Sequence, residues 1–286
     1  SFTSFDSAGL RYSSDNGFHW TELIINKDYG KGIETASMSS DGKTIIVGLL
    51  RKHEYNSDLF ISRDYGSNWI RITNIKGENL WWEGSYINSN GTTIIVNDQY
   101  HGNLFLSKDG GYEWKEIHQP GSASIWPSSA ISSDGLRIIS ANYPGKLMIS
   151  KDAGNTWNFI NPSLQSIMFE DQNWITTSMN FDGNKVLAGI KESIVFYSRD
   201  YGLTWISSIG SLGNSFYWST SAMNSDGRAM LVGENPGLLF ITKDSGQYWS
   251  RGYYFGENDR NWTTSAMSGD GMRIIVGESP GKLYIS

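Results

Sequence analysis

Carboxylates and tryptophans are the side chains that offer this chain the most chemistry. Paired carboxylates can act as general acid and base, and aromatic rings can stack on the apolar faces of sugars. The chain holds 29 Asp and Glu residues and 12 Trp residues among its 286 residues. Six of these Asp and six of these Trp residues recur together in one pattern, Ser/Thr-x-Asp-x-Gly-x-x-Trp. The pattern contains Asp15, Asp64, Asp109, Asp152, Asp200 and Asp244, with Trp20, Trp69, Trp114, Trp157, Trp205 and Trp249.

The pattern predicts a structural turn rather than a catalytic site. An Asp side chain can accept hydrogen bonds from backbone N–H groups of its own loop, and Gly adopts backbone angles that other residues resist. The Trp ring can bury about 150–250 Å² and hold the turn against a sheet. We therefore expect these carboxylates to be structural, and we refer to the six segments as aspartate turns.

The spacing of the aspartate turns predicts the fold. Their Trp residues lie 49, 45, 43, 48 and 44 residues apart, which is the length of a four-stranded propeller blade. Each period also contains an Asp-Gly or Asn-Gly pair between apolar runs, as at Asp41-Gly42 and Asn90-Gly91, and such pairs are typical of tight hairpins. We expect an all-β chain that forms a single closed β-propeller domain over residues 1–286, with four-stranded antiparallel blades.

The two ends of the chain bear on the number of blades. Residues 9–13 and 281–286 occupy the same phase of the repeat, so they would compete for one place in a ring of six. We therefore predict seven blades, with adjacent termini that pair the otherwise exposed strand edges. A six-bladed ring with a displaced terminus is the alternative.

The aspartate turns resemble the Asp-box, or BNR repeat, of sialidases, xyloglucan-hydrolysing propellers, sortilin-type receptors and photosystem-assembly factors. The resemblance covers essentially the whole chain and implies the propeller fold without implying an activity. A sialidase would need three Arg residues around the substrate carboxylate and usually has an Arg-Ile-Pro run, which is absent here. The photosystem-assembly type resembles this chain in size, but it is associated with a basic patch that is not evident in the sequence.

A second set of Trp residues stands at the start of the first strand in most repeats, at Trp82, Trp126, Trp174, Trp218 and Trp262. In a blade this position and the loop after the second strand emerge on the face opposite the aspartate turns, and two such loops carry Glu234 and Glu278. Aromatic rings beside polar groups are typical of sugar-binding sites. The alternative is that each Trp is a buried wedge between neighbouring blades.

Composition narrows the classes of partner and cofactor. The formal charge of -6, with no basic run, argues against nucleic acid. The absence of Cys and the spacing of the four His residues indicate no metal site and no cofactor. There is no apolar run long enough for membrane insertion. The first residue is Ser1 rather than Met, which leaves room for a removed leader. The sequence does not name a compartment, and we slightly prefer a secreted or extracellular one. The sequence does not indicate the oligomeric state.

These observations favour a non-catalytic binding propeller. Carbohydrate recognition on the loop face opposite the aspartate turns is the first hypothesis, because repeated blades would repeat a weak site and gain avidity. A protein-interaction scaffold or assembly factor is the second, supported by the loop Leu49–Tyr55, which no other repeat copies. A sialidase-like glycoside hydrolase is the third.

Overall fold

The computed structural model describes most of the chain and divides it into two compact units, Ser1–Ile125 and Trp126–Ser286. The described residues are 10–15, 17–25, 32–51, 57–77, 80–99, 101–117, 125–160, 163–164, 167–168, 172–209, 217–252 and 260–286. Within these ranges the regular structure consists entirely of β-strands. The single-domain organisation over residues 1–286 stays a prediction.

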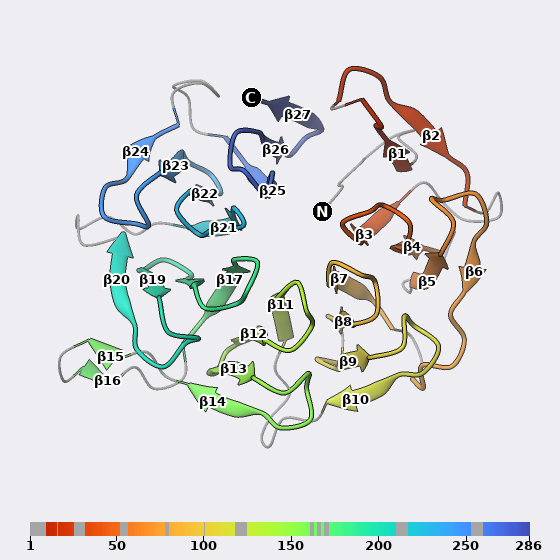
Figure 1. The fold of residues 1–286 in the computed structure, drawn as a ribbon, viewed down its shortest axis with the longest axis horizontal. Helices are drawn as coiled ribbons and strands as arrows, with labels where there is room; N and C mark the ends of the chain where they lie inside the picture. Colours follow the sequence, from red (N-terminus) through yellow and green to blue (C-terminus); the bar gives the residue numbers. More distant parts are fainter. Residues whose placement is uncertain are drawn as a thin grey trace. The chain divides into compact units, whose positions relative to one another are not determined.

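The first unit holds a two-stranded sheet and two four-stranded sheets (Figure 1). The two-stranded sheet pairs β1 (Leu10–Tyr12) with β2 (Thr21–Leu23). The next sheet contains β3 (Ile33–Met38), β4 (Ile45–Leu50), β5 (Ser57–Ser62) and β6 (Ile70–Arg71). The third contains β7 (Trp82–Ile87), β8 (Ile94–Asp98), β9 (Leu104–Ser107) and β10 (Lys115–Ile117).

The second unit holds three four-stranded sheets, one three-stranded sheet and a short hairpin. The first sheet contains β11 (Ile125–Ile131), β12 (Ile138–Tyr143), β13 (Leu147–Ser150) and β14 (Asn158–Ile160), followed by the hairpin of β15 (Ser163–Leu164) and β16 (Ile167–Met168). The next two contain β17 (Trp174–Met179), β18 (Val186–Ile190), β19 (Val195–Ser198) and β20 (Ile206–Ile209), and then β21 (Trp218–Met223), β22 (Met230–Glu234), β23 (Leu239–Thr242) and β24 (Ser250–Arg251). The last contains β25 (Trp262–Met267), β26 (Ile274–Glu278) and β27 (Lys282–Ile285).

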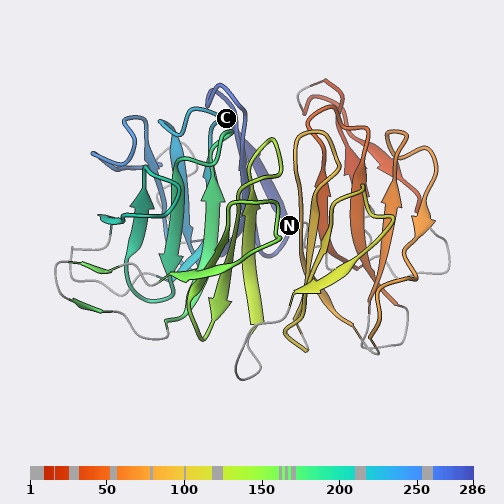
Figure 2. The same cartoon turned by 60° about the horizontal axis from the view of Figure 1, so that its bottom comes forward.

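Each sheet runs up and down in chain order, and neighbouring strands are antiparallel (Figure 2). The Asp-Gly and Asn-Gly pairs connect the first and second strands as predicted. Gly42, for example, has a φ of 73° and lies between Met38 and Ile45, which face each other across the hairpin. The second and third strands are buried along almost their whole length, because apolar side chains cover both of their faces.

The prediction of seven blades is wrong, because the described strands form six. Five sheets have four strands and the sheet β25–β27 has three, whereas β1 and β2 form a separate two-stranded sheet. Leu10 of β1 is buried in the cluster that contains Val47 and Phe60, so this two-stranded hairpin packs on the sheet β3–β6. The described end strands do not pair in one sheet, since β1 pairs with β2 and β27 with β26.

Hydroxyl groups join the first strands of successive sheets within each unit. Thr176 on β17 contacts Ser221 on β21 with 2.7 Å between the oxygens, and Thr220 contacts Ser265 on β25 at the same distance. Thr35 and Ser85 make the equivalent bond of 2.8 Å in the first unit. Because these groups are largely buried, each bond fixes the register of one first strand against the next.

Candidate functional site

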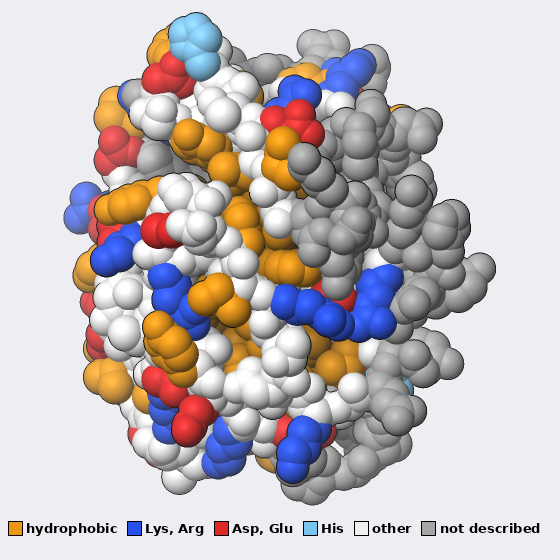
Figure 3. Space-filling model, turned by 90° about the vertical axis from the view of Figure 1, so that its right-hand side faces the viewer, with side chains coloured by type: hydrophobic (Ala, Val, Ile, Leu, Met, Phe, Trp, Pro, Cys, Tyr) orange, Lys and Arg blue, Asp and Glu red, His pale blue; other side chains and the backbone are white. Residues whose placement is uncertain are grey.

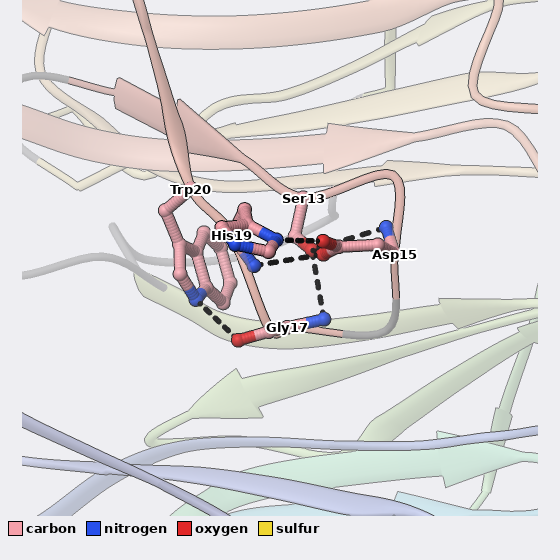
Figure 4. A network of polar contacts seen from close by, with 5 residues as sticks. All are labelled: Ser13, Asp15, Gly17, His19 and Trp20. Carbon is pink, nitrogen blue, oxygen red and sulfur yellow. Dashed lines mark hydrogen bonds and ion pairs between the residues drawn. The ribbon is translucent and has the colours of Figure 1, made fainter.

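The aspartate turns are closed by hydrogen bonds among their own residues (Figure 4). In the first turn the Asp15 carboxylate accepts the His19 backbone N–H at 2.8 Å and contacts the His19 ring. The Gly17 N–H donates to the Ser13 hydroxyl at 2.7 Å, and the Trp20 indole N–H donates to the Gly17 carbonyl at 3.0 Å. The carboxylate, the glycine and the indole therefore all bond inside the turn.

The other five turns repeat the bond from the Gly N–H to the Ser or Thr hydroxyl at 2.8–3.1 Å. In the fourth turn the Thr156 hydroxyl and backbone N–H both donate to Asp152, and they lower the pKa of that carboxyl to about 2. Hydrogen bonds to the charged form favour ionisation. A carboxylate held ionised in this way is a poor general acid near neutral pH.

The Trp residues at the start of the first strands are buried. Trp82, Trp126, Trp174, Trp218 and Trp262 have exposed fractions of 0–3%. Trp82 lies in one cluster with Leu59 of the preceding sheet and Val96 of its own. None of these rings presents a face to solvent, so a sugar-binding proposal finds no support in them.

Two features hold these Trp residues between sheets. A β-bulge follows the first residue, as between Trp82 and Gly84 on β7, and it turns the ring away from the regular alternation of the strand. Four of the five rings also meet an aromatic ring of the third strand at 5.6–5.9 Å between centroids. The pairs are Trp82–Phe105, Trp174–Phe196, Trp218–Phe240 and Trp262–Tyr284.

The predicted loop carboxylates Glu234 and Glu278 bond to their own surroundings. Glu234 is buried and accepts the Leu238 N–H at 3.0 Å. Glu278 accepts a bond of 2.8 Å from Arg260 and one of 2.9 Å from the Tyr284 hydroxyl. Burial alone would raise the pKa of Glu278, but the bonds from Arg260 and Tyr284 outweigh it and lower that pKa. These contacts make both carboxylates part of the internal structure of their loops.

A further carboxylate, which the sequence did not single out, lies at the bulge of β7. Burial, together with the nearby Glu34 carboxylate, raises the pKa of Glu83 to about 7. Glu83 Oε2 is buried and has no hydrogen-bond partner in the described part of the chain, while Oε1 is 3.5 Å from Gln99 Nε2. A carboxyl with this pKa could exchange protons near neutral pH, but its buried oxygen is not presented to a substrate. We do not assign it a catalytic role.

A further candidate site is a cavity of about 190 Å³ in the first unit. Its charged members are Arg51, Asp58 and Arg71, and we call this group the Arg51–Asp58–Arg71 triad. Arg51 donates to both oxygens of Asp58 at 2.8 and 2.9 Å, and Arg71 donates to one of them at 2.8 Å. The Asp58 side chain is 9% exposed, whereas those of Arg51 and Arg71 are 33% and 43% exposed. One buried carboxylate thus holds two guanidinium groups that reach solvent.

Backbone bonds fix the frame of this cavity. The Ser57 N–H donates to the Leu80 carbonyl at 2.9 Å, and the Trp82 N–H donates to the Ser57 hydroxyl at 2.9 Å. The connection from β6 to β7 therefore folds back onto the start of β5. Gly77 in that connection has a φ of 149°, and a Cβ there would lie 2.8 Å from Leu80 Cδ2. Any larger residue would disturb this wall of the cavity.

The triad belongs to the loop face that the sequence analysis favoured. The connection between β4 and β5 supplies Arg51, at the end of the sheet opposite its aspartate turn, and Arg71 ends β6, where it pairs with Phe60. Figure 3, in which the right-hand side of Figure 1 faces the viewer, shows basic side chains next to a carboxylate, with hydrophobic side chains nearby. Arg51 lies in the predicted loop Leu49–Tyr55, of which residues 52–55 are outside the described residues.

The sequence analysis missed the triad because its members are spread over 21 positions. The signal that could have found it is a departure from the repeat. At the register position of Asp58 the other sheets carry Asn103, Lys146, Ile194, Leu238 and Lys282. An acidic residue is thus unique to the first of these sheets.

Comparisons with known proteins identify the fold but not a family. No family model matches the chain, and no curated protein does. Among solved structures, an ancestral GH74 enzyme matches with a TM-score of 0.70 and 16% identity, covering 92% of this chain. This chain has the fold of a β-propeller. The match covers 37% of the GH74 enzyme, so this propeller corresponds to just over a third of that protein's length.

A second solved structure is similar over nearly the whole of both chains. YCF48 bound to a D1 peptide matches with a TM-score of 0.68 and 14% identity, covering 99% of this propeller and 86% of that chain. At such identities the likeness shows the fold alone. Among the described residues, no group of three potential ligand side chains could hold a metal ion, and no helix could cross a membrane.

Proposed function

We propose that this propeller is a non-catalytic binding module that takes a segment of a partner protein at the Arg51–Asp58–Arg71 cavity. The observation that carries the proposal is the cavity itself, in which two partly exposed guanidinium groups stand beside Leu59, Ile72 and Ile75. Arg side chains over apolar pockets are typical of the residues that dominate protein interfaces.

The geometry favours a protein segment over a glycan. The Trp residues that would stack on sugars are buried, and Glu234 and Glu278 are engaged within their loops. The proposal keeps the resemblance of the aspartate turns to the Asp-box. That repeat is shared by propellers with many different roles, so it is compatible with a binding module. One solved propeller of the same fold holds a peptide, so the fold can support such binding.

A catalytic role has less support. The aspartate-turn carboxylates accept bonds within their own turns, and Glu83 has an oxygen buried away from solvent. A glycoside hydrolase would need two carboxyl groups that both reach the substrate. The described residues around the triad supply a single carboxyl, and two guanidinium groups occupy it.

Selection of displayed random peptides, run alongside a glycan array, tests the proposal. We expect selected peptides to bind and to slow hydrogen–deuterium exchange in segments 57–59 and 71–77. Glycan binding without peptide binding would contradict the proposal, and so would protection confined to the aspartate turns. Turnover of a fluorogenic glycoside by the purified chain would overturn the non-catalytic assignment.

A further inference from the structure

We propose that the partner residue entering the cavity is acidic, a Glu or Asp whose carboxylate bonds to Arg71 while its methylene groups contact the apolar wall. This inference rests on the proposed function and names the chemistry of its ligand. The charge of the triad, the hydrogen-bond donors of Arg71 and the size of the cavity each support it.

The triad carries an excess of positive charge. The described residues that line the cavity include two guanidinium groups and the single carboxylate of Asp58. Among these described side chains Asp58 is the single negative charge beside two positive ones, and Leu80, Ile75 and Trp82 line the same site. Because the cavity is partly enclosed, a second carboxylate entering it would be screened less by water, and attracted more strongly, than at an open surface.

Arg71 has the donors to bind that carboxylate. In the described part of the chain its one hydrogen bond runs from Nη2 to Asp58 at 2.8 Å, whereas a guanidinium group has five N–H donors in a planar fork. Its Nε and Nη1 groups therefore remain available to a ligand. The bond to Asp58 holds the guanidinium plane in place, so binding would cost little additional side-chain entropy.

The dimensions limit what can enter. Pockets for whole small ligands have volumes of roughly 300–1,000 Å³, and this cavity has about 190 Å³. It is therefore suited to one side chain of a larger partner rather than to a complete small molecule. The combination of a short apolar stem and a terminal carboxylate describes the side chains of Glu and Asp.

Propionate is the detached side chain of glutamate, and propionamide is that of glutamine, so this pair tests the inference on the full chain. We expect propionate, titrated at constant ionic strength, to produce a saturable NMR shift of the Arg71 Nε–H and Trp82 indole N–H signals. Propionamide should produce at most a weak, unsaturated shift. Equal responses to the two compounds, or a stronger response to inorganic phosphate, would overturn the inference.

Two Arg variants show whether the response arises at the triad. Arg71→Met should weaken the propionate response of Trp82 by about tenfold or more, the loss expected for a charge-assisted bond. Arg251→Met is the matched control, because Arg251 on β24 pairs with Phe240 just as Arg71 on β6 pairs with Phe60. Its response should equal that of the wild type. Arg71→Gln, which keeps a polar group, gives a second reading if Arg71→Met folds poorly.

The selected peptides separate this inference from the proposed function. Replacing the critical Glu or Asp of a cavity-binding peptide by Gln or Asn should weaken binding about tenfold to a hundredfold. Peptides that protect the cavity but tolerate this replacement would overturn the inference and leave the proposed function standing. A saturable propionate response without any peptide binding would instead support the carboxylate chemistry and contradict the proposed function.

Discussion

Replacing Glu83 by Gln should stabilise the fold at neutral and alkaline pH. Burial and the Glu34 carboxylate raise the pKa of Glu83 to about 7, from an ordinary value of 4.5. Below about pH 4.5 the carboxyl is protonated in both the folded and the unfolded chain. As the pH rises, the unfolded chain loses this proton first, so the folded state loses stability until the pH passes about 7.

The size of the effect follows from that difference in pKa. Each unit of pKa is worth ~1.36 kcal/mol, so the rise from 4.5 to about 7 corresponds to roughly 3 kcal/mol. The described groups around Glu83 are consistent with its raised pKa. The Trp81 indole N–H donates to Glu34 at 3.1 Å and so leaves the negative charge of Glu34 near Glu83, and Gln99 Nε2 is 3.5 Å from Glu83 Oε1. Neither contact compensates the buried charge on Glu83 Oε2.

Urea unfolding at several pH values from about 4.5 to about 8 would measure this effect. The difference in free energy of unfolding between Glu83→Gln and the wild type should grow in favour of the variant by about 2–3 kcal/mol over this range. Glu22→Gln on exposed β2 is the control for the same chemical change, and it should stay within about 0.5 kcal/mol of the wild type. A Glu83→Gln difference that does not vary with pH would refute the raised pKa.

Three further predictions concern the framework. Trp174→Ala should lower the free energy of unfolding by about 3–5 kcal/mol. Trp20→Ala should lower it by much less, because the exposed fraction is 36% for Trp20 and 0% for Trp174. Equal losses for the two variants in urea unfolding would contradict the role of Trp174 as a wedge between sheets. Ser221→Ala removes the hydroxyl pair with Thr176 and should cost about 1 kcal/mol; an unchanged urea midpoint would count against it. Hydrogen bonds lower the pKa of the Asp152 carboxyl from its ordinary value of 3.8 to about 2. The ionised carboxylate therefore stabilises the fold fully at pH values above 3.8, and this stabilisation is lost as the pH falls towards about 2. The wild-type chain should therefore have a higher free energy of unfolding than Asp152→Asn near neutral pH, and this difference should shrink in acid. A difference that does not change with pH would refute the lowered pKa.

Much of the fold could be predicted from sequence because local signals repeat. The run Trp218–Met223, the turn at Asp226-Gly227 and the apolar run that follows form β21, a hairpin and β22 as the pattern indicates. The number of blades could not be predicted this way. The phase of the repeat at residues 10–12 matches a third strand, but only packing shows that β1 and β2 lie on the sheet β3–β6.

The candidate site depends on contacts that sequence patterns do not encode. The antiparallel register places Asp58 opposite Leu49, and the chain then brings Arg51 and Arg71 onto the same carboxylate. For the first-strand Trp residues, the sequence was compatible with both an exposed ring and a buried wedge. The bulge after Trp82 and the ring of Phe105 place that residue inside, and neither is visible without strand pairing.

The most direct test of the central claim is the affinity of a selected peptide for two Trp variants of one sheet. Thr73 is exposed at the cavity, and Ser67 is exposed in the aspartate turn at the other end of the same sheet. Filling the cavity mouth with Thr73→Trp should raise the dissociation constant about tenfold or more, while Ser67→Trp should change it by less than about twofold. Unchanged binding by Thr73→Trp, or an equal loss in both variants, would contradict a protein-binding site at the Arg51–Asp58–Arg71 cavity.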